Sequence, residues 1–328
     1  MAARVISFIN LKGGVGKTTL ALAAGEILAG ESINIDTGEV WGFYKKTLLI
    51  DLDGQANLTF AALDEDKIRS YWEQKKSTYH FFLSLIEGNG ASLRECICSE
   101  CSNLQTVSGR LHILPSSFEL FNFEEKVLEG FEEGNGTVPL DLLRRSLESA
   151  FKEEGLLEDY DYIIIDCPPN LSVLTANAIL ASDYYVVPVI PEKLSTYGLQ
   201  LIKRRVSELR EQYPAYVTIE YAGAVLNRVD TRRKDHIEIA ENILMDRDFN
   251  CFRNWIGDWK PLYIVTDFKK GREFRPSTPY QKYGGKARRK QPQRSRLLSG
   301  HGDGNTNGYI RIYERIEGFV EELISRAR

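Results

Sequence analysis

The chain has 328 residues, a net charge of −4 and 43% hydrophobic residues, enough to bury a substantial core. The negative net charge excludes attraction of the whole molecule to DNA, so any contact with nucleic acid requires a local basic patch. The sequence has no apolar run approaching about 18 residues and no signal-peptide pattern, which argues against a membrane or secreted protein. Five cysteines, an odd number, fit a reducing compartment. We therefore expect a cytoplasmic protein without a membrane anchor.

The first element in the chain is a phosphate-binding loop between a strand and a helix. Val5–Asn10 reads as a buried strand, and the loop "LKGGVGKTT" leads into a helical run that reaches Gly30. Glycines let backbone N–H groups converge on phosphate oxygens, and the helix N-terminus adds its dipole. The first glycine of the usual G-x-x-x-x-G-K-[ST] pattern is missing. The pattern still predicts that Lys17 reaches the β- and γ-phosphates of ATP and that the Thr18 hydroxyl binds Mg²⁺. The expected nucleotide-binding residues of the loop are Gly13, Gly14, Val15, Gly16, Lys17, Thr18 and Thr19.

The segment 31–46 interrupts the expected passage from this helix to the next strand. Ile33–Ile35, a turn at Asp36–Glu39 and Val40–Tyr44 read as an inserted β-hairpin. Because the helix runs away from the phosphate loop, we expect the hairpin on the far side of the sheet, away from the nucleotide.

Short apolar runs then alternate with helical patterns such as Leu142–Phe151 and Leu199–Leu209. The runs "TLLID" and "YIIID" are continuously apolar, as strands buried on both faces of a parallel sheet should be. This alternation predicts an α/β fold, a doubly wound and mostly parallel sheet flanked by helices, in a single domain 1–328. The expected strands are Val5–Asn10, Thr47–Leu52, Leu111–Leu114, Tyr162–Ile165, Tyr184–Val189 and Ile219–Leu226.

Aspartates stand at the ends of two of these strands. Asp51 and Asp53 close "TLLIDLD", and Asp166 closes "YIIID". The carboxyl ends of parallel strands are where α/β sheets carry their chemistry, and the alternation of side chains puts Asp51 and Asp53 on one side. Magnesium keeps most of its water shell, so carboxylates that contact it through water are physically reasonable. A helix cap or turn remains the alternative for each aspartate, particularly for Asp53 before Gly54.

The cysteines raise the separate question of a metal site. Cys96, Cys98 and Cys101 lie close together in the sequence, with His112 further on. Their spacing lacks the second pair usual in zinc sites, so we expect them on a surface loop and leave metal binding open. Cys167 is expected to be a small buried residue, because nothing nearby in the sequence supplies a base to activate it.

Basic residues concentrate in the second half of the chain, at Lys203–Arg205, at Arg228–Lys234 and at Lys286–Arg296. A charge run is usually a solvated surface, but lysine and arginine contacts to phosphates would give sequence-independent, salt-sensitive DNA binding. The candidate DNA-binding residues are Arg228, Arg232, Arg233, Lys234, Arg288, Arg289 and Lys290.

The last part of the chain departs from the strand–helix alternation. Residues 275–308 are rich in Gly, Pro and basic residues and read as a flexible loop. Residues 309–328 carry one apolar helical stripe and read as a helix docked on the core. Trp255, Trp259 and Tyr263 are assigned to the core, with a partner surface as the alternative.

Three segments in order resemble the ParA/MinD family of deviant Walker A, SIMIBI-class P-loop ATPases. "KGGVGKTT" resembles the deviant Walker A motif, "LLIDLDGQANLT" the second box, and "YIIIDCPPNLSVLTANAI" the Walker B region. "LHILPSSFELFNFEE" and "GAVLNRVDTRRKDH" are similar to further ParA segments. The resemblance covers residues 4–240 and the last helix. It is closest to ParA-type partition ATPases without an N-terminal helix-turn-helix.

The resemblance implies roles for individual residues. Lys12 resembles the signature lysine that reaches the partner's phosphates across a nucleotide-sandwich dimer, where a cation supplied in trans neutralises charge on the transferred phosphoryl group. The alternative is a solvated lysine before a turn. The expected catalytic residues are Lys12, Lys17 and Asp53, with Asp53 orienting the attacking water. Asp51 and Asp166 are expected to hold Mg²⁺ through water. Asn227 resembles a residue that reads adenine, although an asparagine closing a strand is an equal local explanation. The family's usual proline after Asp53 is replaced by Gly54.

The function implied is a Mg²⁺- and ATP-dependent dimerisation switch with slow, partner-stimulated ATP hydrolysis. In the ATP state it would bind DNA nonspecifically to partition or position DNA or other cargo, with a ParB-like or other activating protein as partner. The alternative is an ATP-gated scaffold or regulator that acts through a protein partner without DNA. A metabolic or redox enzyme on the same fold lacks a supporting motif, and a MinD-like membrane role lacks a basic terminal amphipathic helix.

Overall fold

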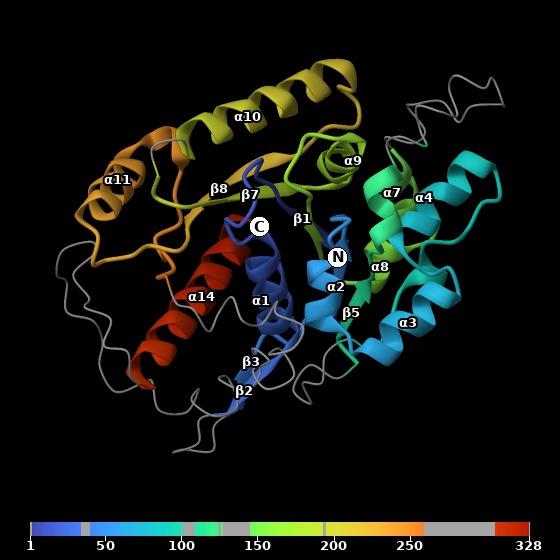
Figure 1. Ribbon diagram of the computed structural model, residues 1–328, viewed down its shortest axis with the longest axis horizontal. Helices are drawn as coiled ribbons and strands as arrows, with labels where there is room; N and C mark the ends of the chain where they lie inside the picture. Colours follow the sequence, from blue (N-terminus) through green and yellow to red (C-terminus); the bar gives the residue numbers. More distant parts are fainter. Residues whose placement is uncertain are drawn as a thin grey trace.

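A six-stranded sheet forms the centre of the computed structural model (Figure 1), which describes residues 2–33, 40–99, 101, 109–123, 126, 145–192, 195–258 and 306–327. Every strand pair in this sheet is parallel. The order is β5 (Leu111–Leu114), β4 (Thr47–Asp51), β6 (Tyr162–Asp166), β1 (Arg4–Phe8), β7 (Tyr184–Val189) and β8 (Glu220–Leu226). The predicted doubly wound α/β fold is therefore confirmed, and the predicted strands differ from the observed ones only at their ends.

Helices cover both faces of the sheet (Figure 1). One face carries α4 (Thr78–Glu87), α7 (Ser146–Glu153), α9 (Val173–Ala181), α10 (Ser195–Gln212) and α11 (Lys234–Met245). The other face carries α1 (Lys17–Ala29), α2 (Asn57–Ala62), α3 (Glu65–Glu73) and α14 (Thr306–Arg326). Shorter elements are α8 (Leu156–Asp159), η1 (Arg94–Cys96), η3 (Phe118–Asn122) and η4 (Arg247–Phe249).

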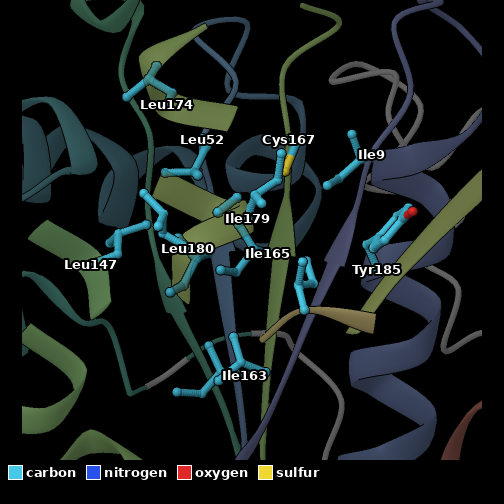
Figure 2. Packing of buried hydrophobic residues seen from close by; sticks show 14 of the residues in the cluster. Ile9, Leu52, Leu147, Ile163, Ile165, Cys167, Leu174, Ile179, Leu180 and Tyr185 are labelled. Atoms are coloured by element: carbon cyan, nitrogen blue, oxygen red, sulfur yellow. The ribbon is translucent and has the colours of Figure 1, made fainter. Parts of the chain in front are cut away.

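The sheet divides the core into two apolar layers because side chains alternate along each strand. In β6, Ile163 and Ile165 join the layer under α9, whereas Ile164 joins the layer under α1. Figure 2 shows the first of these layers, with Leu174, Ile179 and Leu180 of α9 and Leu147 of α7 beside β6. All five residues of β4 and of β6 are buried, as their continuously apolar sequences predict.

The segment after α1 forms two short antiparallel strands, β2 (Glu31–Ile33) and β3 (Val40–Gly42). Helix α1 begins at the phosphate loop and ends at Ala29, so this pair lies at the opposite end of α1 from the loop (Figure 1). Residues 34–39, which contain the predicted turn, lie outside the described residues.

The C-terminal helix α14 packs beside α1 (Figure 1). Its apolar stripe is buried, and Phe319 makes edge-on ring contacts with Phe8 of β1 and with Phe252. Because α14 and α2 cover α1 on the side away from the sheet, α1 is apolar nearly all round. Helix α14 begins at Thr306, so residues 306–308, assigned to the loop 275–308 by the sequence, are helical. The rest of that loop, with Arg288, Arg289 and Lys290, lies outside the described residues, as do Trp259 and Tyr263. Trp255 is buried.

The three clustered cysteines are buried, which corrects their assignment to a surface loop. Cys96 belongs to the apolar layer under α9, whereas Cys98 and Cys101 belong to the layer under α1. The physical reason is that the backbone of Cys98 pairs with Ile113 of β5, which draws the segment against the sheet. Burial raises the pKa of the Cys96 thiol to about 11, so this thiol stays protonated. Among the described residues, no group of three or more His, Cys, Asp or Glu side chains, these cysteines included, is arranged to ligate a metal ion directly.

Within the described part of the chain, no helix has the length and apolarity needed to cross a bilayer.

We predict that Phe319→Ala lowers the free energy of unfolding by about 3–5 kcal/mol, because the fully buried ring fills the space between α1, α14 and β1. Urea denaturation followed by circular dichroism measures this change. Met245→Ala, at a side chain that is 71% exposed, serves as the control and should change stability by about 0.5 kcal/mol or less. Equal losses in the two variants would contradict the docking of α14 on the core.

Candidate nucleotide site

The loop between β1 and α1 depends on glycines at two positions. Gly14 has φ 73° and Gly16 has φ 94°, both in the left-handed region that favours glycine. A Cβ atom at Gly16 would lie 2.1 Å from Nδ2 of Asn227, so no other residue fits there without a shift. A Cβ at Gly13 or Gly14 would meet no atom within 4 Å, because this side of the loop borders open space. The loop is therefore held closely on one side and open on the other.

The N-terminus of α1 points at this open side with its backbone donors unused by any cap. Gly16 is the N-cap, no side chain caps the helix, and the first turn contains no acidic residue. The first N–H groups of a helix have no intrahelical partner, and the helix dipole adds partial positive charge there. The end of α1 is therefore suited to bind an anion such as phosphate.

Lys17 lies beneath the loop rather than in solvent. Its side chain is buried, and Nζ donates hydrogen bonds to the backbone oxygen of Asn10 at 3.0 Å and of Lys12 at 3.4 Å. Burial lowers the pKa of Lys17, while the charges of Asp166 and Asp53 oppose that change. The ammonium group is thus fixed between the loop and the carboxylates of the neighbouring strands.

Asp51 and Asp166 face each other across neighbouring strands. They are register partners in the parallel pair β4–β6, whose strands lie about 4.8 Å apart, and both residues are fully buried. One oxygen of Asp51 accepts hydrogen bonds from the Thr59 amide at 2.9 Å and the Thr59 hydroxyl at 2.7 Å. The other oxygen accepts the Asp53 amide at 3.1 Å. Burial nevertheless raises the pKa of Asp51 to about 7.

Asp166 has no such support. Among the described residues, neither of its carboxylate oxygens has a hydrogen-bond partner. Burial raises the pKa of Asp166 well above its ordinary value, the nearby Asp51 raises it further, and Thr18 and Lys17 oppose this. The Thr18 hydroxyl is close enough to interact with the carboxylate but does not complete a hydrogen bond of normal geometry. Unsatisfied carboxylate oxygens beside a threonine hydroxyl are the donor set that Mg²⁺ prefers, so these residues fit that ion.

Asp53 follows β4 and lies between the strand end and η3. Its backbone oxygen accepts a 2.8 Å hydrogen bond from the Ser116 hydroxyl, and its carboxylate accepts the Gln55 amide at 3.0 Å. The residue is 8% exposed, and burial raises its pKa, with the Lys17 charge opposing. The carboxylate is therefore held in one position at the rim of the buried cluster.

Two residues of this site have no role in the sequence-based assignment. Thr59 holds Asp51, and the Ser116 amide donates to the Thr59 hydroxyl at 2.8 Å, which links η3 to the strand end. Both occur in segments with family resemblance, "LLIDLDGQANLT" and "LHILPSSFELFNFEE". Their hydroxyls stand at different distances after β4 and β5, so no local pattern in the sequence singles them out.

Two predicted site residues lie apart from the carboxylate cluster. Lys12 is half-exposed at the loop entrance and forms an ion pair with Glu192, which follows β7. Asn227 is fully buried at the end of β8, where Nδ2 donates to the Val15 oxygen at 2.8 Å. Its amide oxygen accepts the Arg228 N–H at 2.9 Å. A trans role for Lys12 and an adenine-reading role for Asn227 remain predictions.

Three of the four described candidates for DNA binding, Arg228, Arg232 and Arg233, are paired with groups of the protein. Arg232 forms hydrogen bonds of 2.8 and 3.0 Å with Asp230, and Arg233 pairs with Asp235. Arg228 donates to the Gly14 oxygen of the phosphate loop at 3.1 Å. Lys234 is exposed at the first residue of α11. DNA contact by these residues remains a prediction.

Comparison with known proteins finds a family model, curated relatives and solved structures that are similar to this chain. A family model described as an AAA domain (AAA_31) matches residues 3–219. Virulence plasmid ParA family protein pGP5-D of Chlamydia psittaci is 31% identical, over 73% of this chain and 76% of its own length. Chromosome partitioning protein ParA of Caulobacter vibrioides (strain NA1000 / CB15N) is 29% identical over 73% and 75%, respectively. A solved structure of cobyrinic acid a,c-diamide synthase from Mycobacterium smegmatis, with bound ATP analogue and magnesium, has a TM-score of 0.57 at 24% identity. That alignment covers 81% of this chain and 92% of the other, and it supports the fold alone.

We predict that the raised pKa of Asp51 makes the fold less stable as pH rises. Below a pH of about 7 the folded chain holds a proton at Asp51 that the unfolded chain releases near its ordinary pKa of 3.8. Between these two values the free energy of unfolding therefore falls with rising pH, by at most about 1.4 kcal/mol per unit from this group. Asp51→Asn should flatten this dependence.

Urea denaturation at about pH 5 and about pH 7.5, without nucleotide or magnesium, tests the pH effect as the difference between parent and Asp51→Asn. Asp66→Asn, at an exposed position on α3, is the control and should follow the parent. An Asp51→Asn curve parallel to that of the parent would show that Asp51 is ionised throughout.

Proposed function

The chain belongs to the AAA domain family and is a ParA-type P-loop ATPase, and from that premise we propose that it is a Mg²⁺- and ATP-dependent dimerisation switch that binds DNA nonspecifically. The observation that carries the proposal is the buried cluster of Lys17, Asp51, Asp53 and Asp166 beneath an uncapped helix N-terminus. Three carboxyl groups and one ammonium share a site where two of the carboxyl pKa values are raised by burial and mutual repulsion. A phosphate chain with a divalent cation would supply both the anion for the loop and the positive charge for the carboxylates.

The loop amides from Gly13 to Thr19 would bind the phosphates of ATP, with Lys17 below them. Thr18, Asp51 and Asp166 would hold Mg²⁺, the two carboxylates through water. Magnesium, when bound, neutralises negative charge on the phosphate oxygens and so favours transfer of the terminal phosphoryl group. A solved structure of the same fold that holds an ATP analogue and magnesium motivates this choice of ligands.

Asp53 would orient the water that attacks the terminal phosphoryl group. The carboxylate is held by the Gln55 amide, and the backbone by Ser116, so it has one preferred direction. A carboxylate that is held in one position and is only 8% exposed is suited to align one water molecule and accept its proton. Slow hydrolysis until a partner completes the site is consistent with a single positioned carboxylate.

Lys12 would act on the second copy of the chain. Its side chain is 45% exposed at the entrance of the loop, and its ion pair with Glu192 lies on the same exposed side. An exposed ion pair contributes little free energy, about 0–1 kcal/mol, so the lysine exchanges this partner readily for a phosphate. Dimerisation around ATP would then depend on Lys12 and would tie hydrolysis to assembly.

Nonspecific DNA binding in the ATP state would be the output of the switch. The name of the Caulobacter relative, a chromosome partitioning protein, supports this output. Arg232 and Arg233 are exposed, but each has a neighbouring carboxylate that DNA phosphates would have to displace. We therefore assign Lys234 and the segment with Arg288, Arg289 and Lys290 the larger share of binding. The odd number of cysteines, five, supports a cytoplasmic location.

The alternative output is an ATP-gated scaffold that acts through a protein partner, and one observation favours it. Phe118 is 51% exposed and Phe121 58% exposed on η3, which packs directly against Gly54 next to Asp53. Exposed aromatic side chains beside a catalytic loop are suited to bind an activating protein. A ParB-like activator would use the same surface whether or not DNA is bound.

We predict that Asp53→Ala lowers the rate of ATP hydrolysis at saturating ATP by about 100-fold or more, because no other group aligns the water. The dissociation constant for ATP should change by less than about 3-fold, since Lys17 and the loop amides remain. Phosphate release and fluorescent-nucleotide titration measure the two quantities. Asp66→Ala is the control, and hydrolysis by Asp53→Ala at the parental rate would refute the assignment.

We predict that Lys12→Ala binds ATP but no longer forms an ATP-dependent dimer, because the charge that reaches the partner's phosphates is lost. Light scattering with Asp53→Ala as background, which slows ATP turnover, measures the oligomeric state. Glu192→Gln removes the same ion pair while keeping the lysine and should still dimerise. If Lys12→Ala dimerises like its parent, the lysine acts only within its own chain or not at all.

We predict salt-sensitive binding to a random-sequence DNA duplex with ATP, and little binding with ADP or without nucleotide. Fluorescence anisotropy with Asp53→Ala protein and magnesium, at two salt concentrations, provides the measurement. Lys234→Ala should weaken binding and reduce the salt dependence. Absence of binding in all states, in a protein that still dimerises with ATP, would support the protein-partner alternative.

A further inference from the structure

Two consecutive carbonyl groups of the phosphate loop are held by side chains from the end of β8. The Gly14 oxygen accepts a hydrogen bond from Nη1 of Arg228 at 3.1 Å. The Val15 oxygen accepts one from Nδ2 of Asn227 at 2.8 Å. The paired residues are 214 and 212 positions apart in the sequence, respectively. They connect the segment that follows β8 to this part of the loop.

The orientation of a carbonyl determines the orientation of the next amide. A trans peptide unit is planar, so its C=O and its N–H point in opposite directions. The hydrogen bond to the Gly14 oxygen thus turns the N–H of Val15 away from Arg228. In the same way, the hydrogen bond to the Val15 oxygen turns the N–H of Gly16 away from Asn227. Both N–H groups therefore point away from the side chains that follow β8, and the loop borders open space at Gly13 and Gly14.

We propose that Arg228 is a positioning residue for the phosphate loop, which presets its amides for the phosphates of ATP, and that it is not a DNA contact. This inference rests on the proposed ATP site. Without the hydrogen bond, the carbonyl of Gly14 loses a contact that fixes its direction, and glycine permits a wider range of backbone conformations than any other residue would at this position. ATP binding would then have to order the loop. The affinity for ATP would fall in proportion to the fraction of molecules whose loop already has the arrangement that binds phosphate.

The conformation of Arg228 is itself strained, which supports a functional role. Its φ is 55°, in the left-handed region that a non-glycine residue seldom adopts. The strain persists because three contacts hold the residue. Its N–H bonds to the Asn227 amide oxygen, its Nη1 to Gly14, and its Nε lies 3.5 Å from Oδ1 of Asp258. Non-glycine residues in such conformations concentrate at ligand clamps and active sites.

Asp258 connects this clamp to the C-terminal part of the protein. Its N–H bonds to the Val229 oxygen at 3.0 Å, and the Val229 N–H bonds to the Ile256 oxygen at 3.0 Å, so residues 256–258 run alongside the end of β8. Trp255, in the same segment, accepts a hydrogen bond from Arg315 of α14 at 3.1 Å. The guanidinium group of Arg228 is therefore held by a segment that contacts α14, and it holds the phosphate loop in turn.

The test is the equilibrium affinity for ATP and ADP, measured with fluorescent nucleotide analogues and Mg²⁺ on the full chain, beside the hydrolysis rate at saturating ATP. Arg228→Ala should raise both dissociation constants about 10-fold, as expected for loss of a hydrogen bond from a charged donor. The rate at saturation should change by less than about 3-fold, because bound phosphates order the loop. Arg228→Lys should recover part of the affinity, since it keeps one donor, and Asp258→Asn should lose less than Arg228→Ala.

Arg204→Ala is the matched control, because Arg204 pairs with Glu208 at 3.0 Å on α10, away from the loop, and its loss should leave nucleotide affinity unchanged. If Arg228→Ala does not fold by circular dichroism, Asp258→Asn carries the test. ATP affinity equal to that of the parent in these variants overturns the inference. If Arg228→Ala in addition binds DNA more weakly, Arg228 is a DNA contact instead. A parent chain that does not bind ATP would instead refute the proposed function, which separates the two failures.

Discussion

The crowding of buried carboxylates at the ends of β4 and β6 is the constraint on which the rest of this site depends. Asp51 and Asp166 are register partners, so the sheet itself forces two fully buried carboxyl groups together, with Asp53 at their rim. One ammonium group, Lys17, interacts with two of them, Asp166 and Asp53. Such a cluster is costly without further positive charge. A phosphate-bound divalent cation is a physically sufficient reason for a fold to retain it, which is why the cluster carries the functional argument.

The phosphate loop above this cluster is held from two directions. From below, Lys17 donates to backbone oxygens of the loop. From the side, Asn227 and Arg228 hold the oxygens of Val15 and Gly14. On the remaining side, the loop borders open space at Gly13 and Gly14, beside the uncapped N-terminus of α1. The sheet order puts β1 between β6 and β7, so the loop after β1 lies beside the carboxylates of β6 and one strand from β8. The anion site is therefore assembled by strand order. Helix α14 packs beside α1 in the same layer, where Phe319 contacts Phe8 and Phe252.

Features of the fold and the site that depend on neighbouring residues could be predicted from the sequence, whereas those that depend on tertiary packing could not. The continuous apolar runs of β4 and β6 and the glycine loop before α1 identify the fold and the phosphate site, because period and loop composition are local properties. The spacing of Cys96, Cys98 and Cys101 lacks a second metal-ligand pair and predicts a surface loop, whereas pairing of Cys98 with Ile113 buries them. Thr59 and Ser116 were given no role, because a lone hydroxyl carries no pattern until its partner is known.

The sequence by itself determined the strand–helix alternation, the parallel sheet, the phosphate loop and the three aspartates at strand ends, since each follows from neighbouring residues in the chain. Only the tertiary structure decided that Asp166 has no hydrogen-bond partner among the described residues, that Lys12 pairs with Glu192, and that Arg228 belongs to the phosphate loop. These contacts join residues far apart in the sequence, and their distances are set by strand order and helix packing, which no local pattern encodes.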